Sequence, residues 1–358
     1  MSTGSVHALA LPYLEQHPPV GRLRLLFGDV RIDVHSNSGE LLEKLGGYFQ
    51  SFLASGGEPD IEVTAIQRPV LDLGLDYTVK QPEPGKTKIK EEYLDLDDGR
   101  IIRKRLTGMV FFLAGDTQAA MGPCIENDNQ VINFINNRFI ERLIKRGSLL
   151  FHASGVALRG KGLNMAGFAG MGKSTLALNI MCQGTDFVSN DRVMVEPSDG
   201  GLMMHGVPKM PRVNPGTVLH NESLRPVIPE AERERFEQLP PEQLWDLEHK
   251  YDALIEECFG EDKFTLSCPM RALVLLNWQR DGSTLRIKEV DLSERRDLMP
   301  AFMKELGLFF EWDERTRHRD MSDNAYIQLL RDCPVFELSG GVDFDKAADF
   351  CVDFLKKA

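Results

Sequence analysis

The feature that most constrains this 358-residue chain is a glycine-rich segment between a strand-like run and a helix-like run. Residues 167–174 read Gly-Phe-Ala-Gly-Met-Gly-Lys-Ser, which satisfies the spacing GxxxxGK[ST] in full. Apolar LNMAG leads into the segment and TLALNIMC follows it. This strand, loop and helix context favours a P-loop over a chance match in a glycine-rich turn.

The residue types in this loop fit the binding of nucleoside triphosphate. Glycines allow positive φ and close approach of the backbone, so that consecutive N–H groups and the following helix N-terminus face the phosphates. Lys173 is placed to reach the β- and γ-phosphates, and Ser174 to bind Mg²⁺. ATP with Mg²⁺ is therefore the expected ligand. The residues expected to bind it are Gly167, Ala169, Gly170, Met171, Gly172, Lys173, Ser174 and Thr175.

The flanks of the loop carry two further candidate residues. FHASGVAL, RGKG and LNMAG predict that His152 lies on a strand that forms a hairpin with the strand entering the loop. DFVSNDRVMVE predicts Asp191 at the end of the next strand, where an acid can bind metal or act as a base. The structural alternatives are a core histidine for His152, and a helix cap or a salt bridge with Arg192 for Asp191.

Segment 148–197, with this histidine, P-loop and acid, resembles the catalytic domain of HPr kinase/phosphorylase, and in particular a branch called HprK-related kinase B. The resemblance implies a phosphoenolpyruvate-carboxykinase-like P-loop fold. It places His152 beside the reacting phosphate, assigns Lys173 and Ser174 to the phosphates and metal, and matches Asp191 to the second acid of an Asp pair. The implied catalytic residues are His152, Lys173 and Asp191, and the implied metal ligands are Ser174 and Asp191.

Two departures from the family pattern leave the phosphoryl acceptor open. Asn190 stands where the family has the first Asp, and an amide cannot accept a proton. The stretch 203–213 contains no acid where the family carries a metal-assisting Glu. We therefore expect an ATP-dependent kinase acting on a hydroxyl of a protein Ser/Thr or of a small molecule. The alternative is a nucleotide-binding or slow ATPase module without a dedicated acceptor.

Residues outside the motif give weaker expectations. Lys209 and Arg212 either neutralise phosphate charge or lie solvated on the surface. A basic cluster at 315–319 is expected to be a solvated loop, the alternative being a docking site for an acidic substrate. An insertion at 223–262 is expected to be helical and to be anchored by Trp245 and Tyr251.

The strand and helix patterns divide the chain into two predicted domains. Residues 1–146 predict a smaller α+β domain for recognition of substrate or partners, and 147–358 predict the α/β P-loop domain. Residues 1–20 are expected to lie loosely on the surface. Helices are expected at 39–54, 128–146, 291–307 and 343–357.

Net charge, cysteine spacing and hydropathy limit the partners and the cellular location that we expect. The formal net charge of -12 argues against nucleic acid and against an anionic membrane surface as partners. The six cysteines form no CxxC pair and are expected to be reduced. Without a signal-peptide pattern or a long apolar run, we expect a cytoplasmic protein. The family resemblance adds the expectation of a homo-oligomer.

Overall fold

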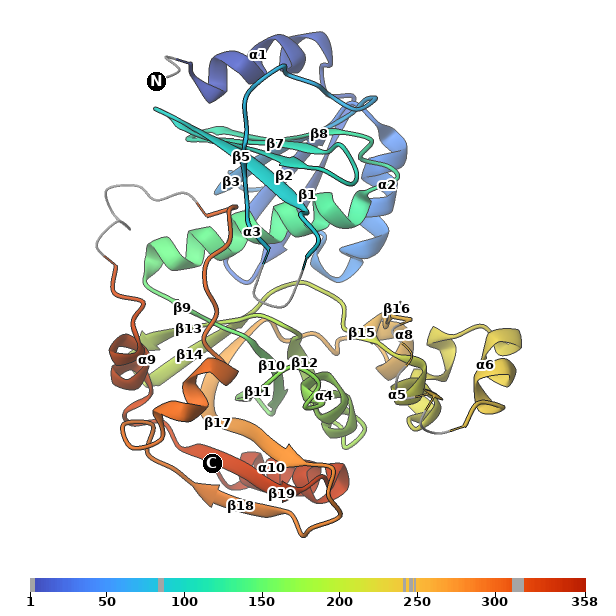
Figure 1. The fold of residues 1–358 in the computed structure, drawn as a ribbon, viewed down its shortest axis with the longest axis vertical. Coiled ribbons are helices and arrows are strands. Elements are labelled where there is room, and N and C mark those ends of the chain that lie inside the picture. The colour runs from blue at the N-terminus through green and yellow to red at the C-terminus, as the bar shows by residue number, and fades with distance from the viewer. Residues whose placement is uncertain (1–3, 83–86, 241–242, 245–246, 248, 311–318) are drawn as a thin grey trace. The chain divides into compact units, whose positions relative to one another are not determined.

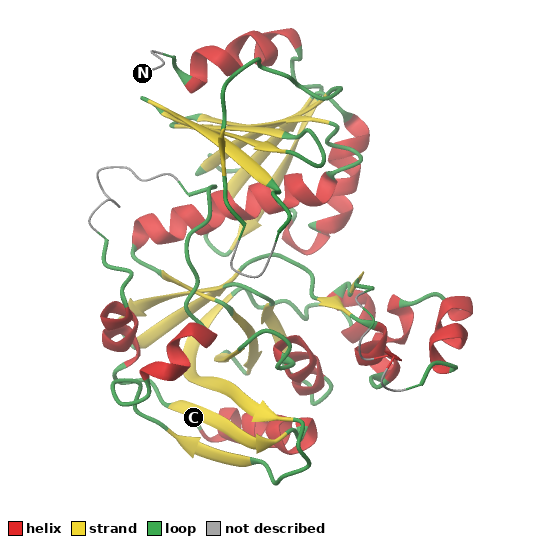
Figure 2. Cartoon of the chain, in the orientation of Figure 1, coloured by secondary structure: helices red, strands yellow, loops and turns green. Residues whose placement is uncertain are grey.

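The computed structural model describes residues 4–82, 87–240, 243–244, 247, 249–310 and 319–358. It is a mixed α/β structure with two large sheets (Figures 1 and 2). The chain divides into two compact units. Unit 1 comprises Met1–Arg142 and Leu306–Arg317, and unit 2 comprises Leu143–Glu305 and His318–Ala358.

Unit 1 is built on a sheet in which eight strands are described, in the order β1-β2-β3-β8-β7-β6-β5-β4. The pairs β2–β3 and β3–β8 are parallel, whereas the remaining neighbours are antiparallel. The strands are β1 (Gly21–Phe27), β2 (Val30–Ser36), β3 (Ile61–Gln67), β4 (Thr78–Val79), β5 (Glu91–Leu96), β6 (Gly99–Lys104), β7 (Val110–Ala114) and β8 (Thr117–Gly122).

Helices cover both faces of this sheet, which explains why every residue of β7 is buried. Phe112 packs in a cluster with Val6 and Ala10 of α1 (Val6–Gln16). Its neighbour Phe111 points to the opposite face and contacts Phe134 of α3 (Asp128–Arg146) at 5.1 Å between ring centroids. Figure 1 shows α1 and α3 on opposite sides of the sheet.

Three expectations for unit 1 have definite outcomes. The helix expected at 128–146 is confirmed as α3, and that at 39–54 is confirmed in part as α2 (Gly39–Tyr48) followed by a 3-10 turn, η1 (Gln50–Phe52). The expectation that residues 1–20 lie loosely on the surface is wrong, because 6–16 form α1 with a buried apolar side. Ser5 caps α1, and the Asp98 carboxylate accepts hydrogen bonds from its first backbone N–H groups.

Residues 306–310 belong with unit 1, although the strand and helix patterns of the sequence predict them in the second domain. The Arg100 guanidinium donates to the Leu308 carbonyl at 3.0 Å. The Phe309 ring packs edge-on against Phe111, with 5.0 Å between centroids. These are long-range contacts that local sequence patterns do not reveal.

Unit 2 is built on a sheet in which nine strands are described. Its central strand is β17, which pairs in parallel with β11 on one side. On its other side the first part of β17 pairs with β14 and the later part with β19. The strands are β9 (Leu149–Phe151), β10 (Ala153–Leu158), β11 (Lys161–Gly167), β12 (Asp186–Ser189), β13 (Val193–Ser198), β14 (Gly201–Gly206), β17 (Ser267–Gln279), β18 (Arg286–Glu289) and β19 (Val335–Gly341).

Two helices pack together beside the strands that carry the glycine-rich loop. They are α4 (Lys173–Met181), which follows the loop, and α10 (Phe344–Lys357), and both contact β10 and β11. The final helix expected at 343–357 is thus confirmed, with Asp343 as its cap. An aromatic cluster of Phe151, Phe302 and Tyr326 links β9 to η3 (Arg296–Ala301) and α9 (Asp323–Leu330).

The helix expected at 291–307 is wrong, since only the 3-10 turn η3 forms there. Pro300 lies inside the segment and cannot supply a helical N–H. Asp291 accepts a hydrogen bond from the Ser293 backbone N–H at 2.7 Å, which is an Asx turn and not a capping box.

The described part of the insertion contains short helices separated by loops. They are α5 (Pro215–Leu219), η2 (Glu222–Val227), α6 (Glu230–Glu237) and α8 (Ile255–Phe259), and a small two-stranded pair joins β15 (Arg212–Val213) to β16 (Tyr251–Asp252). The Tyr251 ring packs against Phe236, which is itself part of the insertion, with 6.5 Å between ring centroids, whereas the Tyr251 backbone pairs with Val213 outside it. Trp245 lies outside the described residues. None of the described helices is both long and apolar enough to cross a bilayer.

Candidate functional site

The glycine-rich loop leaves β11 at Gly167 and enters α4 at Lys173. Gly170 and Gly172 have φ of 79° and 86°, a region that favours glycine. A Cβ on Gly172 would also lie 2.6 Å from Cζ of Phe344. The Lys173 ammonium curls back and donates to the Gly167 carbonyl at 2.8 Å, which closes the loop. The backbone thus has the form of an anion-binding turn at the start of a nine-residue helix.

Asn190 connects the loop to the neighbouring hairpin. Its Oδ1 accepts a hydrogen bond from Ser174 Oγ at 2.7 Å and another from Ser154 Oγ at 3.0 Å. Ser154 lies on β10, and Asn190 follows β12, so three separate elements meet at one amide oxygen. The amide therefore fixes the position of the Ser174 hydroxyl.

Asp191 lies in the turn between β12 and β13 with φ of 73°. Its carboxylate is 3.3 Å from His152 Nε2, 3.5 Å from Lys304 Nζ and 3.7 Å from Arg192 Nε. Burial raises the pKa of Asp191, but the His152 hydrogen bond and the charges of the surrounding cations outweigh it. The net effect holds the pKa well below its usual range. Asp191 is therefore an ionised carboxylate at neutral pH.

The loop, Asn190 and Asp191 open into one cavity of about 500 Å³ within unit 2. Among its described lining residues Asp191 is the sole acid, whereas five basic side chains face the same space. Such a lining favours an anionic ligand, even though the whole chain is acidic. The basic lining residues are Lys173, Lys209, Arg212, Lys250 and Arg280.

Burial and neighbouring cations lower the pKa of two lysines that line this cavity. Burial lowers the pKa of Lys173 and of Lys209, and the Asp191 charge opposes the effect in both. Lys304 lowers the pKa of both lysines further by charge repulsion. A bound anion would relieve that repulsion, so the cation cluster is poised for a phosphate ligand.

The donor set tests whether magnesium fits this site. Ser174, Ser154 and Asn190 present neutral oxygens and Asp191 a carboxylate, and oxygen is the ligand atom that Mg²⁺ prefers. Within the described residues no group of three or more His, Cys, Asp or Glu forms a metal cage. These residues therefore fit a magnesium ion that arrives with phosphates and keeps several waters, not one held by protein alone.

The structure brings most of the sequence-predicted residues to this cavity. The ones that line it are His152, Ala169, Gly170, Gly172, Lys173, Ser174, Thr175 and Asp191, together with Lys209 and Arg212. Gly167 instead accepts the lysine hydrogen bond, and Met171 lines an adjoining cavity. The expectation that His152 lies on a strand is wrong by one residue, since it occupies the break between β9 and β10.

Several residues that the fold brings to the site carry no signal in the sequence. Ser154 and Lys304 contact Asn190 and Asp191, and Lys250, Arg280 and Phe344 line the cavity. Lys250, Arg280, Lys304 and Phe344 lie 77 to 171 residues after Lys173 in the sequence, and no local pattern marks them. Of the basic cluster at 315–319 only Arg319 is described, and it donates to the Gly147 carbonyl; Arg315, Arg317 and His318 lie outside the described residues.

Comparisons with known proteins give no family assignment. No family model matches the chain, and no curated protein matches its sequence. Among solved structures, the chain is similar to the HPr(Ser) kinase/phosphatase from Coxiella burnetii, with 10% sequence identity and a TM-score of 0.28. The match covers 58% of this chain and 93% of that one. A similarity this low supports no conclusion about the site.

Proposed function

We propose that unit 2 binds Mg-ATP at residues 167–175 and transfers the γ-phosphoryl group to a hydroxyl of a protein Ser/Thr or of a small molecule. The observation that carries the proposal is the cavity shared by Lys173, Ser174, His152 and Asp191. A phosphate-binding turn, an ionised acid and surplus cations in one cavity are the parts that phosphoryl transfer needs. We also propose the phosphoenolpyruvate-carboxykinase-like arrangement for this unit.

Each side chain has a role that its surroundings support. Lys173 would leave the Gly167 carbonyl and neutralise the β- and γ-phosphates, while Ser174 and Asp191 would supply oxygens to the metal. Magnesium, when bound, neutralises phosphate charge and orients the γ-phosphoryl group. Lys209 and Arg212 would stabilise charge on the group in transfer.

Asp191 is better suited to positioning than to proton abstraction. A carboxylate whose pKa is held below its usual range is a weak base at neutral pH. Phosphoryl transfer passes through a loose transition state in which positioning and charge stabilisation dominate. Asp191 would therefore act through the metal that it helps to hold, and His152 beside it would orient the acceptor hydroxyl.

A second function is favoured by one observation. The Ser174 hydroxyl donates to an amide, Asn190, and not to an acid, and Asp191 is already paired with His152, Lys304 and Arg192. A site with so little free carboxylate fits a nucleotide-binding or slow ATPase module that signals by changing conformation.

Labelled ATP distinguishes the two functions. The full chain is incubated with γ-³²P-ATP, Mg²⁺ and either lysate fractions or candidate metabolites, beside Lys173→Ala and Asp191→Ala. Lys357→Ala on the exposed end of α10 serves as the matched lysine control. A kinase labels an acceptor in wild type and control but not in Lys173→Ala. Release of labelled phosphate alone, with no Lys173-dependent acceptor, would refute the kinase and leave the ATPase module.

A further inference from the structure

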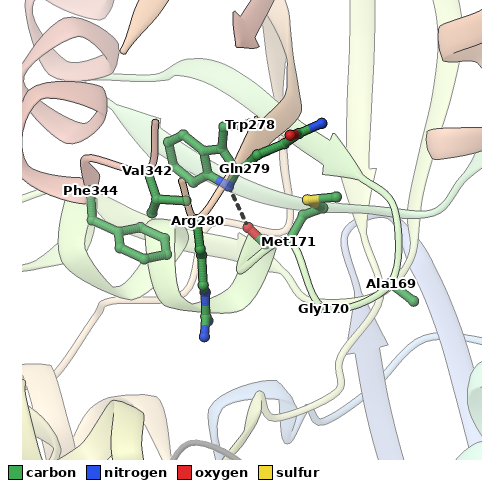
Figure 3. A pocket seen from close by; sticks show the side chains of 8 residues that line it. All are labelled: Ala169, Gly170, Met171, Trp278, Gln279, Arg280, Val342 and Phe344. Atoms are coloured by element: carbon green, nitrogen blue, oxygen red, sulfur yellow. Dashed lines mark hydrogen bonds between the residues drawn. The ribbon is translucent and has the colours of Figure 1, made fainter. Parts of the chain in front are cut away.

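A second cavity, of about 310 Å³, adjoins the glycine-rich loop. Four of its lining residues, namely Ala169, Gly170, Arg280 and Phe344, also line the larger cavity that holds Lys173 and Ser174. The two spaces therefore meet along the loop. Figure 3 shows that the rings of Trp278 and Phe344 lie near the Arg280 side chain, beside the loop residues. The full lining is Ala169, Gly170, Met171, Trp278, Gln279, Arg280, Val342 and Phe344.

Trp278 ties this cavity to the loop. The residue is 2% exposed, and its Nε1–H donates to the Met171 carbonyl at 3.0 Å (Figure 3). The indole thus satisfies its polar atom and supports the loop from β17. The Phe344 ring meets it edge-on, with 5.1 Å between centroids and planes at 79°. This pair forms one aromatic wall of the cavity.

Phe344 is the aromatic ring best placed to meet a ligand. It is only partly buried, it lines both cavities, and it stands where a Cβ on Gly172 would touch it. Val342 and Met171 add apolar surface, whereas Gln279 and Arg280 add exposed polar groups at the rim. An apolar, aromatic space with a few polar groups is the lining that small flat ligands prefer.

We propose that this second cavity binds the nucleobase of the nucleotide whose phosphates occupy the glycine-rich loop. The inference rests on the proposed function, because it needs the phosphates in the first cavity. A nucleotide joins a polyanion to a flat ring through one sugar, so its two ends require an anionic subsite and an aromatic subsite that communicate. The two cavities have these characters and share the loop between them. Phe344 would stack on the ring, and Gln279 and Arg280 would meet its polar edge.

Comparing the affinity for ATP with the affinity for inorganic tripolyphosphate measures what the nucleobase contributes to binding. Both are titrated into the full chain with Mg²⁺ by calorimetry. We expect wild type to bind ATP about tenfold or more tightly than tripolyphosphate, because stacking of a base on an aromatic ring contributes on that order. Val342→Trp, which fills the cavity from its wall, should remove most of that advantage and leave tripolyphosphate affinity within about twofold.

Two further variants provide a second test and a matched control. Phe344→Ala should also reduce the ratio of ATP to tripolyphosphate affinity, by removing the stacking ring. Phe350→Ala is the matched control, since Phe350 lies on the same helix against Phe336 and outside the lining of both cavities. It should leave the ratio unchanged. Thermal unfolding of each variant verifies that it is folded.

The outcomes separate the two proposals. If Val342→Trp and Phe344→Ala are folded and keep the wild-type ratio, the base does not occupy this cavity and the inference is overturned. A loss of phosphoryl transfer in Val342→Trp at an unchanged ratio would assign the cavity to the acceptor, which also overturns it. If tripolyphosphate fails to bind wild type at all, the phosphate site itself fails, and the proposed function with it.

Discussion

Replacing Asp191 by Asn removes one charge from the centre of the candidate site. Asn tolerates the positive φ of this position, so the substitution tests charge and not backbone strain. The Asp191 side chain is 32% exposed and lies within 3.7 Å of three cationic or protonatable groups. A partly buried network of this size should contribute about 2 kcal/mol to the free energy of unfolding at pH 7.

The pH dependence follows from the direction of the pKa shift. Because the folded-state pKa of Asp191 is lowered, its stabilisation is complete above the unfolded-state pKa and is lost as pH falls. With an unfolded-state value of about 3.9, the wild-type advantage over Asp191→Asn should shrink by about 1 kcal/mol between pH 7 and pH 3. The loss continues at still lower pH.

Urea unfolding of both proteins between pH 7 and pH 3 measures this difference. The control is Asp332→Asn, which removes an acid from an exposed pair with Arg331 (3.8 Å; side chains 92% and 70% exposed). That variant should match wild type within about 0.5 kcal/mol. Equal stability of Asp191→Asn and wild type at pH 7, or a difference that does not change with pH, would refute the charge network.

Three other substitutions test neighbouring features. Gly172→Ala should weaken Mg-ATP binding by at least about tenfold and lower the melting temperature, because the added Cβ would contact Phe344 and residue 172 has a positive φ. Calorimetry and thermal unfolding measure the two effects, and a wild-type affinity would contradict the loop geometry. Lys209→Gln should weaken binding of metal-free tripolyphosphate by about threefold to tenfold, an effect that added salt reduces; an unchanged affinity would remove Lys209 from the site. Phe309→Ala should destabilise the chain by about 2 kcal/mol in urea through its contact with Phe111, and a change below 0.5 kcal/mol would contradict that packing.

The parts of the site that follow one another in the sequence could be predicted. The loop at 167–174, the β10–β11 hairpin and the turn carrying Asp191 lie within forty residues of one another, so their patterns are local. The hairpin required only the turn-rich tetrad at 159–162, where Arg159 and Gly160 take positive φ.

The other parts of the fold and of the site depend on tertiary contacts that no local sequence pattern encodes. Asp98 reads as a hairpin residue, and it does precede β6, but its carboxylate also fixes the start of α1 more than ninety residues away. Lys304 reaches Asp191 from a segment that reads as helical in the sequence and is irregular in the structure. Arg280 and Phe344 enter the site because parallel pairing of β17 and β19 places their ends together.

Equilibrium binding of Mg-ATP to the full chain and to Lys173→Ala, with Lys357→Ala as control, tests nucleotide binding at the glycine-rich loop. We expect saturable binding at one site per chain for wild type and control, and an affinity at least about tenfold lower for Lys173→Ala. A folded wild-type chain that shows no saturable binding at millimolar Mg-ATP, or a Lys173→Ala variant that binds as tightly as wild type, would contradict this expectation.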